Sequence, residues 1–391
     1  MQIALLRLRV RGPGGAEATL QHLARGLAAA GHQVTVYGIA SEPENAAPLG
    51  PQVHYVKVPV WGGKTGRLLI YALNTRRLLQ KTRPDVVLSL ERTLFQQVYR
   101  AGDGCHREWL ARRSPFLSPG KRLVQRVSPF HRVLLWLEKR LFAGPELKRV
   151  IANSRQVRKE IIRHYQVDPS LIKVVYNGLH LGVFHPVAES ERQSRRRGFG
   201  IPDEDKIILF VGSGFARKGL VYLLDAVSRL KNGPVRLWVV GKDRVSPYQT
   251  LAQKLGIAAQ VRFWGPRAEV APFYQAADLL ALPTLYDPCS NAVLEALGCG
   301  CPVLTTAANG AAEFILPGIN GEVMAQPDAV PLWVEALRQW LPRRRDPRVS
   351  QAARDAVAHL SWEATVFQTL EVLEEAVAAG SFWGGGARHL S

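Results

Sequence analysis

The sequence predicts an α/β protein with two doubly wound parallel sheets, and three observations support this. Short apolar runs rich in β-branched residues alternate with amphipathic stretches along most of the 391 residues, a pattern typical of parallel strands joined by helices. A polar, charged stretch over 184–200 divides two such series and predicts a linker. The length also suits at least two domains, because one domain usually takes about 150 residues.

The predicted strands are short, continuous apolar runs, as expected for strands buried on both faces of a sheet. They are Ile3–Val10, Val34–Ile39, Asp85–Leu90 and Arg149–Asn153 in the first series, and Ile207–Gly212, Val235–Val240, Val261–Trp264, Leu279–Pro283 and Pro302–Thr306 in the second. The clearest helix covers Ala16–Ala30, where apolar residues recur at helical spacing and Gly31 ends the pattern. A last long helix is predicted over Trp362–Ala379, followed by a frayed tail.

The predicted domains are 1–183, completed by the final helix at 362–379, and 184–361. Two doubly wound domains that face each other leave a cleft lined by the carboxyl ends of strands. Ligands bind at such ends. Candidate site residues are therefore expected in the loops that follow predicted strands.

The formal net charge is +19, and its distribution is uneven. Residues 1–197 contain 33 Lys and Arg against 13 Asp and Glu, whereas the rest of the chain is close to neutral. Such a field favours an anionic partner: nucleic acid, anionic lipid or a phosphorylated substrate. The alternative is a genome whose proteins are generally rich in arginine, but this does not explain why the excess positive charge is confined to one half of the sequence.

The sequence predicts neither a membrane-spanning helix nor a metal site. No apolar run reaches about 18 residues, and the N-terminal segment lacks the uninterrupted core of a signal peptide, so a cytoplasmic location is expected. The four cysteines have neither disulfide nor zinc spacing. The acidic run 203–205 precedes a strand, which is the wrong end for a metal site, and we expect a solvated loop there.

Glycine-rich turns follow predicted strands at two places. Gly14 and Gly15 lie between the first strand and the first helix, where a helix N-terminus suits a phosphate, although a plain turn is the alternative. Arg217 and Lys218 lie side by side in VGSGFARKGL, after the first strand of the second series. Adjacent cations at a strand end repel each other unless an anion lies between them, and a solvated pair is the alternative.

The acidic pair Asp287 and Glu295 flanks a predicted helix N-terminus in LYDPCSNAVLEALG. Ser290 is expected to be the N-cap, and the amides near Asn291 and Ala292 suit a phosphate. Glu295 is expected to accept hydrogen bonds from ribose hydroxyls, and Asp287 from a hexose. A surface position for Glu295 is the alternative, although its neighbours along the chain are apolar.

The segment 99–113, YRAGDGCHREWLARR, follows another predicted strand. Asp103 and His106 are candidates to face the cleft, with a structural aspartate and an uninvolved histidine as the alternatives. Basic residues interleaved with Trp and Phe continue as far as Trp136. This composition suits an anionic membrane surface, where each basic residue adds about 1 kcal/mol of attraction.

Taken together, these motifs resemble those of the retaining GT-B glycosyltransferases of family 4, whose two Rossmann-like domains face each other across a cleft. The resemblance covers most of the chain and rests on GGAE at 14–17, NG at 177–178, RKG at 217–219 and the Asp287–Glu295 spacing. Within the family, residues 101–109, 136–142 and 152–161 are most similar to bacterial lipopolysaccharide core glucosyltransferases, which add the first glucose to inner-core heptose.

The resemblance implies a nucleotide-sugar donor, most simply UDP-glucose, with no metal and no other cofactor. It implies that Arg217 and Lys218 bind the diphosphate, that Glu295 binds the ribose and that Asp287 holds the donor sugar. The family usually has Glu at the position of Asp287, and PCSN replaces a glycine-rich stretch after it. These departures leave a mannosyl- or heptosyltransferase of the same fold as the nearest alternative.

For the first domain, the resemblance implies that Gly14 and Gly15 lie near the distal phosphate. Asp103 matches an acidic residue proposed to be catalytic, and His106 is the reserve candidate. The implied acceptor is a lipopolysaccharide core, which is anionic and anchored in the inner membrane. The basic first domain is therefore expected to dock as a peripheral protein on the cytoplasmic face of that membrane.

Two other classes of protein would also suit parts of this sequence. A nucleic-acid-binding protein would suit the high charge, but the sequence has no RNP, zinc-finger or helix-turn-helix signature, so no nucleic-acid partner is expected. The other is a non-catalytic sugar-nucleotide-binding protein. The joint presence of Arg217, Lys218, Asp287 and Glu295 argues against a decayed site, and a test of donor hydrolysis separates binding from catalysis.

Overall fold

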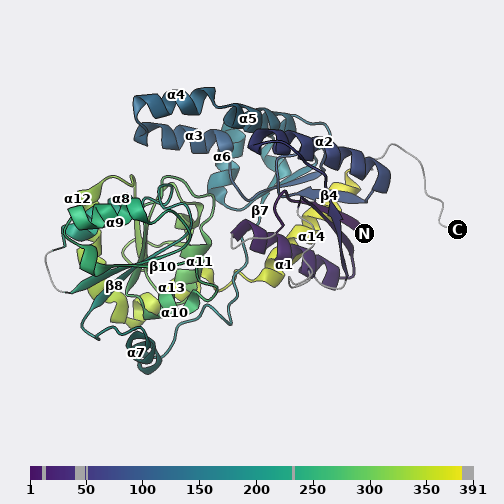
Figure 1. The fold of residues 1–391 in the computed structure, drawn as a ribbon. Helices are drawn as coiled ribbons and strands as arrows, with labels where there is room; N and C mark the ends of the chain where they lie inside the picture. The colour runs from purple at the N-terminus through teal and green to yellow at the C-terminus, as the bar shows by residue number, and fades with distance from the viewer. Residues whose placement is uncertain (11–14, 40–48, 50–51, 231–233, 381–391) are drawn as a thin grey trace. The chain divides into compact units, whose positions relative to one another are not determined.

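The computed structural model of the chain describes residues 1–10, 15–39, 49, 52–230 and 234–380. It divides into two compact units, Met1–Asn177 with Trp362–Ser391, and Gly178–Ser361 (Figure 1). The division falls before Gly178, whereas the predicted boundary follows residue 183. The predicted frayed tail lies almost entirely outside the described residues.

The first unit contains a seven-stranded parallel sheet with the order β3-β2-β1-β4-β5-β6-β7. Its strands are β1 (Gln2–Leu6), β2 (Gln33–Gly38), β3 (Val53–Lys57), β4 (Val86–Ser89), β5 (Val98–Ala101), β6 (Arg149–Ala152) and β7 (Ile172–Val174). Its helices are α1 (Gly15–Ala29), α2 (Lys64–Thr82), α3 (His106–Arg113), α4 (Pro119–Val127), α5 (Pro129–Phe142), α6 (Arg155–Tyr165) and α14 (Trp362–Ala378).

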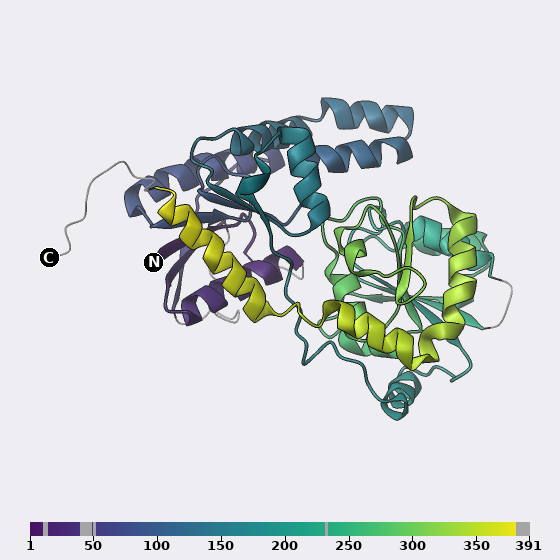
Figure 2. The same ribbon diagram turned by 180° about the vertical axis from the view of Figure 1, so that it is seen from behind.

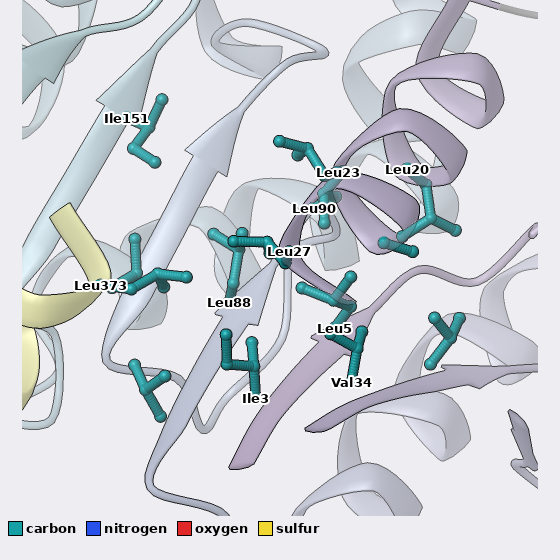
Figure 3. Packing of buried hydrophobic residues seen from close by; sticks show 14 of the residues in the cluster. Ile3, Leu5, Leu20, Leu23, Leu27, Val34, Leu88, Leu90, Ile151 and Leu373 are labelled. Carbon is teal, nitrogen blue, oxygen red and sulfur yellow. The ribbon is translucent and has the colours of Figure 1, made fainter. Parts of the chain in front are cut away.

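The core of the first unit lies between the sheet and two helices from opposite ends of the chain. Leu20, Leu23 and Leu27 of α1 pack on the central strands, and Leu373 of α14 belongs to the same cluster (Figure 3). Each such leucine stabilises the native state by about 1.5–3 kcal/mol relative to an exposed position. The helical spacing of the apolar residues in α1 thus becomes one buried stripe.

Helix α14 joins the first unit although it follows the whole second unit in sequence (Figure 2). It packs beside α1, where a Cβ at Gly26 would lie 2.4 Å from a methyl carbon of Val366, so glycine permits the close approach. Its charged face is tied to the sheet by Arg149, whose Nε donates to Glu375 at 2.8 Å. The final helix was therefore assigned to the correct unit by the sequence.

The second unit contains a six-stranded parallel sheet with the order β10-β9-β8-β11-β12-β13. Its strands are β8 (Lys206–Val211), β9 (Val235–Val240), β10 (Val261–Gly265), β11 (Leu279–Leu282), β12 (Val303–Thr306) and β13 (Gly321–Met324). Its helices are α7 (Glu189–Gly198), α8 (Leu220–Ser228), α9 (Ser246–Lys254), α10 (Ala271–Ala276), α11 (Asn291–Gly298), α12 (Val330–Trp340) and α13 (Pro347–Val357). Among the described residues, no helix is long and apolar enough to cross a membrane.

The predicted linker over 184–200 is wrong, because most of it forms α7. Arg192 and Arg196 of this helix are buried, and their guanidinium groups donate to the carboxylate of Asp278 at 2.5 and 3.4 Å. The backbone amide of Ile207 donates to the same carboxylate at 2.6 Å. This charged stretch packs as a helix of the second unit because Asp278, a buried aspartate before β11, supplies the counter-charge for the two buried arginines.

The acidic run at 203–205 forms the expected solvated turn at Asp203 and Glu204, which are exposed, but not at Asp205. Asp205 is buried, its side chain accepts a hydrogen bond from Arg236, and its backbone carbonyl accepts one from Arg196. This aspartate is therefore part of the packing at the amino end of β8.

Replacement of Asp278 by Asn should lower the free energy of unfolding by about 3 kcal/mol, because it leaves buried arginines without their counter-charge. Urea denaturation followed by tryptophan fluorescence measures this. Glu189→Gln is the matched control, because Glu189 contacts Arg192 at 3.2 Å from an exposed position and should cost less than about 1 kcal/mol. Equal losses of unfolding free energy in the two variants would contradict the role of Asp278 as the counter-charge of the buried arginines.

Candidate active site

The loop after β8 carries the predicted cation pair and packs tightly on the neighbouring strand. Gly219 has a φ of +77°, and a Cβ there would lie 1.8 Å from the carbonyl oxygen of Pro283. The amide of Leu285 donates to the carbonyl of Arg217 at 2.9 Å. Only glycine fits this close approach, and it fixes Arg217 and Lys218 at the carboxyl ends of β8 and β11.

Asp287 lies between the two cations. Its Oδ2 accepts a hydrogen bond from Nη1 of Arg217 at 3.2 Å and another from Nζ of Lys218. Nη1 of Arg217 also donates to the carbonyl of Tyr286 at 3.0 Å. The sequence argument required an anion between the cations, and in the structure this protein's own aspartate is that anion.

The charges of this cluster are set by burial and by each other. Burial alone would raise the pKa of Asp287, but Lys218 and Arg217 hold it below its ordinary value. Burial lowers the pKa of Lys218 despite the attraction of Asp287. The side chain of Lys218 is 7% exposed and that of Arg217 is 35% exposed, so Arg217 is the cation that solvent reaches.

Helix α11 begins after Ser290, as predicted, but the serine hydroxyl does not cap it. The hydroxyl instead accepts a hydrogen bond from Nζ of Lys218 at 3.0 Å. Asn309 holds the turn: its Oδ1 accepts from the amides of Ser290 at 3.2 Å and Ala311 at 3.1 Å. Asn291 and Ala292 form the first turn of the helix beside this cluster.

Glu295 is on the same helix, one turn further along. Its Oε2 accepts a hydrogen bond from the hydroxyl of Tyr274 at 2.8 Å, and its other oxygen has no hydrogen bond among the described residues. Burial raises the pKa of Glu295, with Tyr274 and Lys218 acting in the opposite direction. The side chain is only partly exposed, which excludes the plain surface position considered from sequence.

Asp103 lies at the corresponding edge of the first sheet, in the loop after β5. Its Oδ2 accepts a hydrogen bond from Nη1 of Arg7 at 2.9 Å, and its side chain is 39% exposed. Arg7 follows β1, and its Nη1 also lies 3.9 Å from Oε2 of Glu91, which follows β4. Asp103, Arg7 and Glu91 thus come from the carboxyl ends of three neighbouring strands.

His106 is separate from this group. It is buried at the start of α3, and its Nε2 shares a hydrogen bond of 3.0 Å with Nδ1 of His131 on α5. Burial, assisted by the charge of Arg92, lowers the pKa of His106 to about 3, so the ring is neutral. The structure therefore places Asp103, rather than His106, at the polar edge of the sheet.

A buried ion pair orders the loop that carries Asp103. Nε of Arg92 donates to Glu138 at 2.9 Å, and Nη2 of Arg92 donates to the carbonyl of Gly104 at 2.7 Å. Glu138 also accepts from the amide of His106 at 2.8 Å, in the first turn of α3. The backbone on the carboxyl side of Asp103 is therefore fixed by one buried carboxylate–guanidinium pair.

Gly15 begins α1, whereas Gly14 lies outside the described residues. The expected phosphate position next to it is therefore not described. The part of the chain that the structure describes contains no cluster of three or more His, Cys, Asp or Glu side chains suited to a metal ion.

Sequence reasoning missed Arg7, Glu91, Tyr274 and Asn309. The available signal was position: Arg7 and Glu91 each follow a buried strand closely, at the end of the sheet where sites lie. Tyr274 and Asn309 gave no local signal, because their roles depend on partners brought together by folding.

Comparison with known proteins gives a consistent result. The description "Glycosyltransferase Family 4" matches residues 13–182, and "Glycosyl transferases group 1" matches residues 191–355. The lipopolysaccharide glucosyltransferase WaaG of Escherichia coli (strain K12) is 30% identical over 334 residues, which cover 84% of this chain and 86% of WaaG.

Solved structures extend the likeness to the whole fold. The crystal structure of WaaG, a glycosyltransferase involved in lipopolysaccharide biosynthesis, has a TM-score of 0.82 at 26% identity and covers 95% of this chain and 99% of its own. HepE of Anabaena in complex with UDP-glucose has a TM-score of 0.68 at 20% identity, covering 97% and 99%, and supports the fold alone.

The two parallel-sheet units and these matches define a glycosyltransferase of the GT-B fold. The chain belongs to glycosyltransferase family 4, and its similarity to WaaG spans most of both chains.

Glu295→Gln should raise thermal stability at pH 7 and leave it nearly unchanged at pH 4. The raised pKa of Glu295 means that the native state holds this proton more tightly than the unfolded chain. Its favourable contribution is present below the unfolded pKa and is lost as the pH rises through the folded pKa. Scanning fluorimetry measures the midpoints.

Glu335→Gln, on the exposed face of α12, is the matched control for Glu295→Gln. At each pH value, this control should have the same midpoint as the wild type. A Glu295→Gln protein that is less stable than the wild type at pH 7 would show that the carboxylate is not penalised by burial.

Proposed function

We propose that the second unit binds UDP-glucose, with Arg217 and Lys218 on the diphosphate and Glu295 on the ribose. The observation that carries this proposal is that both cations share one oxygen of Asp287 at the carboxyl edge of a parallel sheet. No hydrogen bond to Oδ1 of Asp287 occurs among the described residues, so this oxygen is available for the donor sugar. The match to WaaG, named a glucosyltransferase, favours glucose.

The proposed chemistry is transfer with retention and without metal. Negative charge develops on the leaving diphosphate as the glycosidic bond breaks, and fixed donors stabilise it when they are aimed at that charge. Arg217, Lys218 and the amino end of α11 at Asn291 and Ala292 supply those donors. The acceptor hydroxyl attacks the same face of the positively charged sugar as the bond to the diphosphate breaks, and its proton passes to an oxygen of the leaving diphosphate, so no enzyme nucleophile is required.

The first unit binds the acceptor in this proposal, and Asp103 is the catalytic residue that hydrogen-bonds the attacking hydroxyl. Its side chain is exposed to solvent, whereas His106 is buried and neutral. The similarity to WaaG favours a lipopolysaccharide core as the acceptor. Such an acceptor is anionic, and the excess positive charge lies in the half of the sequence that forms this unit.

We further propose that the first unit docks on the cytoplasmic face of the inner membrane through α4. This helix has no buried residue, and it exposes Leu123, Val124 and Val127 beside Arg122 and Arg126. A hollow of about 590 Å³, lined mainly by apolar surface of α3, α4 and α5, adjoins it. Apolar side chains mixed with cations on a helix suit the boundary of an anionic bilayer.

A panel of donors tests the nucleotide-sugar assignment. The full chain is titrated by calorimetry with UDP-glucose, UDP-galactose, UDP-GlcNAc, GDP-mannose and ADP-heptose, each in EDTA. We expect binding of UDP-glucose that Glu295→Ala abolishes. Preference for another donor would replace glucose by that sugar, and binding that needs Mg²⁺ would overturn the metal-free chemistry.

Arg217→Ala should lower turnover by roughly 10²–10³, because it removes the exposed cation from the developing charge. Arg229→Ala is the control, since Arg229 pairs with Asp225 on an exposed helix face. Initial rates with UDP-glucose and a purified core acceptor measure both variants. Near-wild-type turnover of Arg217→Ala would remove this residue from the mechanism.

The combined replacement of Leu123, Val124 and Val127 by Ser should reduce sedimentation with phosphatidylglycerol vesicles several-fold and leave donor binding unchanged. Leu332→Ser is the matched control, because Leu332 is an exposed leucine of the second unit. No loss in the triple variant would exclude α4 as the docking element, and equal binding to phosphatidylcholine vesicles would overturn the preference for an anionic surface.

A further inference from the structure

Arg7 is a buried cation that the proposed mechanism does not yet use. It follows β1 directly and is 8% exposed. Its Nη1 donates to the carbonyl of Leu90 at 2.7 Å and to Oδ2 of Asp103 at 2.9 Å. A single nitrogen thus links the backbone after β4 to the carboxylate after β5.

The cation is shared unequally between two carboxylates. Nη1 lies 2.9 Å from Asp103 but 3.9 Å from Glu91. Asp103 and Glu91 raise the pKa of Arg7, outweighing the effect of burial, so the guanidinium stays charged. Burial raises the pKa of Glu91, and the nearby charge of Asp103 adds to this shift. Arg7 is therefore primarily the partner of Asp103.

The exposure of the two carboxylates also favours Asp103, rather than Glu91, as the functional partner of Arg7. The side chain of Asp103 is 39% exposed, whereas that of Glu91 is 12% exposed. Asp103 is flanked by glycines, which have no side chains that could contact its carboxylate. The charge-assisted hydrogen bond from the buried Arg7 connects this carboxylate to the sheet.

We propose that Arg7 is a positioning residue of the transfer reaction, acting through Asp103. This rests on the proposed function of Asp103 as the group that hydrogen-bonds the acceptor hydroxyl. Arg7 anchors one oxygen of the carboxylate to the rigid sheet, which fixes the direction in which the carboxylate meets the acceptor. Misplacement of a catalytic group by about 1 Å costs as much as 10²-fold in rate.

A double-mutant cycle tests the proposal with Arg7→Lys, Asp103→Asn and their combination. Lysine keeps the charge but loses the planar fork, and it preserves more of the buried packing than alanine. We expect Arg7→Lys to lower kcat by roughly 10- to 100-fold with the KM for the donor unchanged. In the Asp103→Asn background, Arg7→Lys should change kcat by less than about 2-fold, because the catalytic carboxylate that Arg7 positions has been removed.

Arg9→Lys is the control, since Arg9 is an exposed arginine of the same segment, and its kcat should equal that of the wild type. Hydrolysis of the donor in the absence of acceptor is the second readout, and Arg7→Lys should leave this rate unchanged. If Arg7 only stabilised the fold, Arg7→Lys would lower the melting temperature, the rate of transfer and the rate of donor hydrolysis together.

Two results would overturn the proposal, and they are distinguishable. Losses that multiply in the double variant, with Asp103→Asn itself impaired, would refute the role of Arg7 and leave the proposed function intact. An Asp103→Asn enzyme with the turnover of the wild type would refute the role of Asp103 in the proposed function, and with it the action of Arg7 through that residue.

Discussion

The carboxylate of Asp287 is the charge on which the polar edge of the second unit depends. Its side chain neutralises Arg217 and Lys218, and its backbone joins the strand end before it to the loop after β12 through Ala308 and Gly310. Buried charges that lose such a partner are costly, so the three side chains are stable only together. This edge of the sheet is therefore held together by contacts within the chain, with Arg217 as the cation that solvent reaches.

Much of the fold could be predicted because strands buried on both faces have continuous apolar sequences. The predicted strands correspond to β1, β2, β4, β6 and β8–β12. Four of the described strands were not predicted: β3 is only half-buried, β5 contains Arg100, and β7 and β13 are only three and four residues long. Helix α7 was mistaken for a linker because its buried arginines depend on Asp278, far away in sequence.

The candidate site could be predicted in parts but not as an arrangement. Local motifs indicated Arg217, Lys218, Asp287, Glu295 and Asp103, because each follows a predicted strand or lies at a helix start. No local pattern showed that Asp287 pairs with both cations or that His106 is bonded to His131. These contacts join segments that are distant in sequence, so only the folded chain reveals them.

The return of α14 to the first unit determines the order in which the chain matures during translation. The second unit, Gly178–Ser361, is one uninterrupted segment, and all of it is synthesised before α14. Val372, Leu373 and Ala376 then close the core that Ile3 and Leu88 begin. Domains usually mature from the N-terminus onward during synthesis. Here the first unit keeps an open apolar face until α14 has been made, so its nascent form exposes apolar surface that α14 later covers.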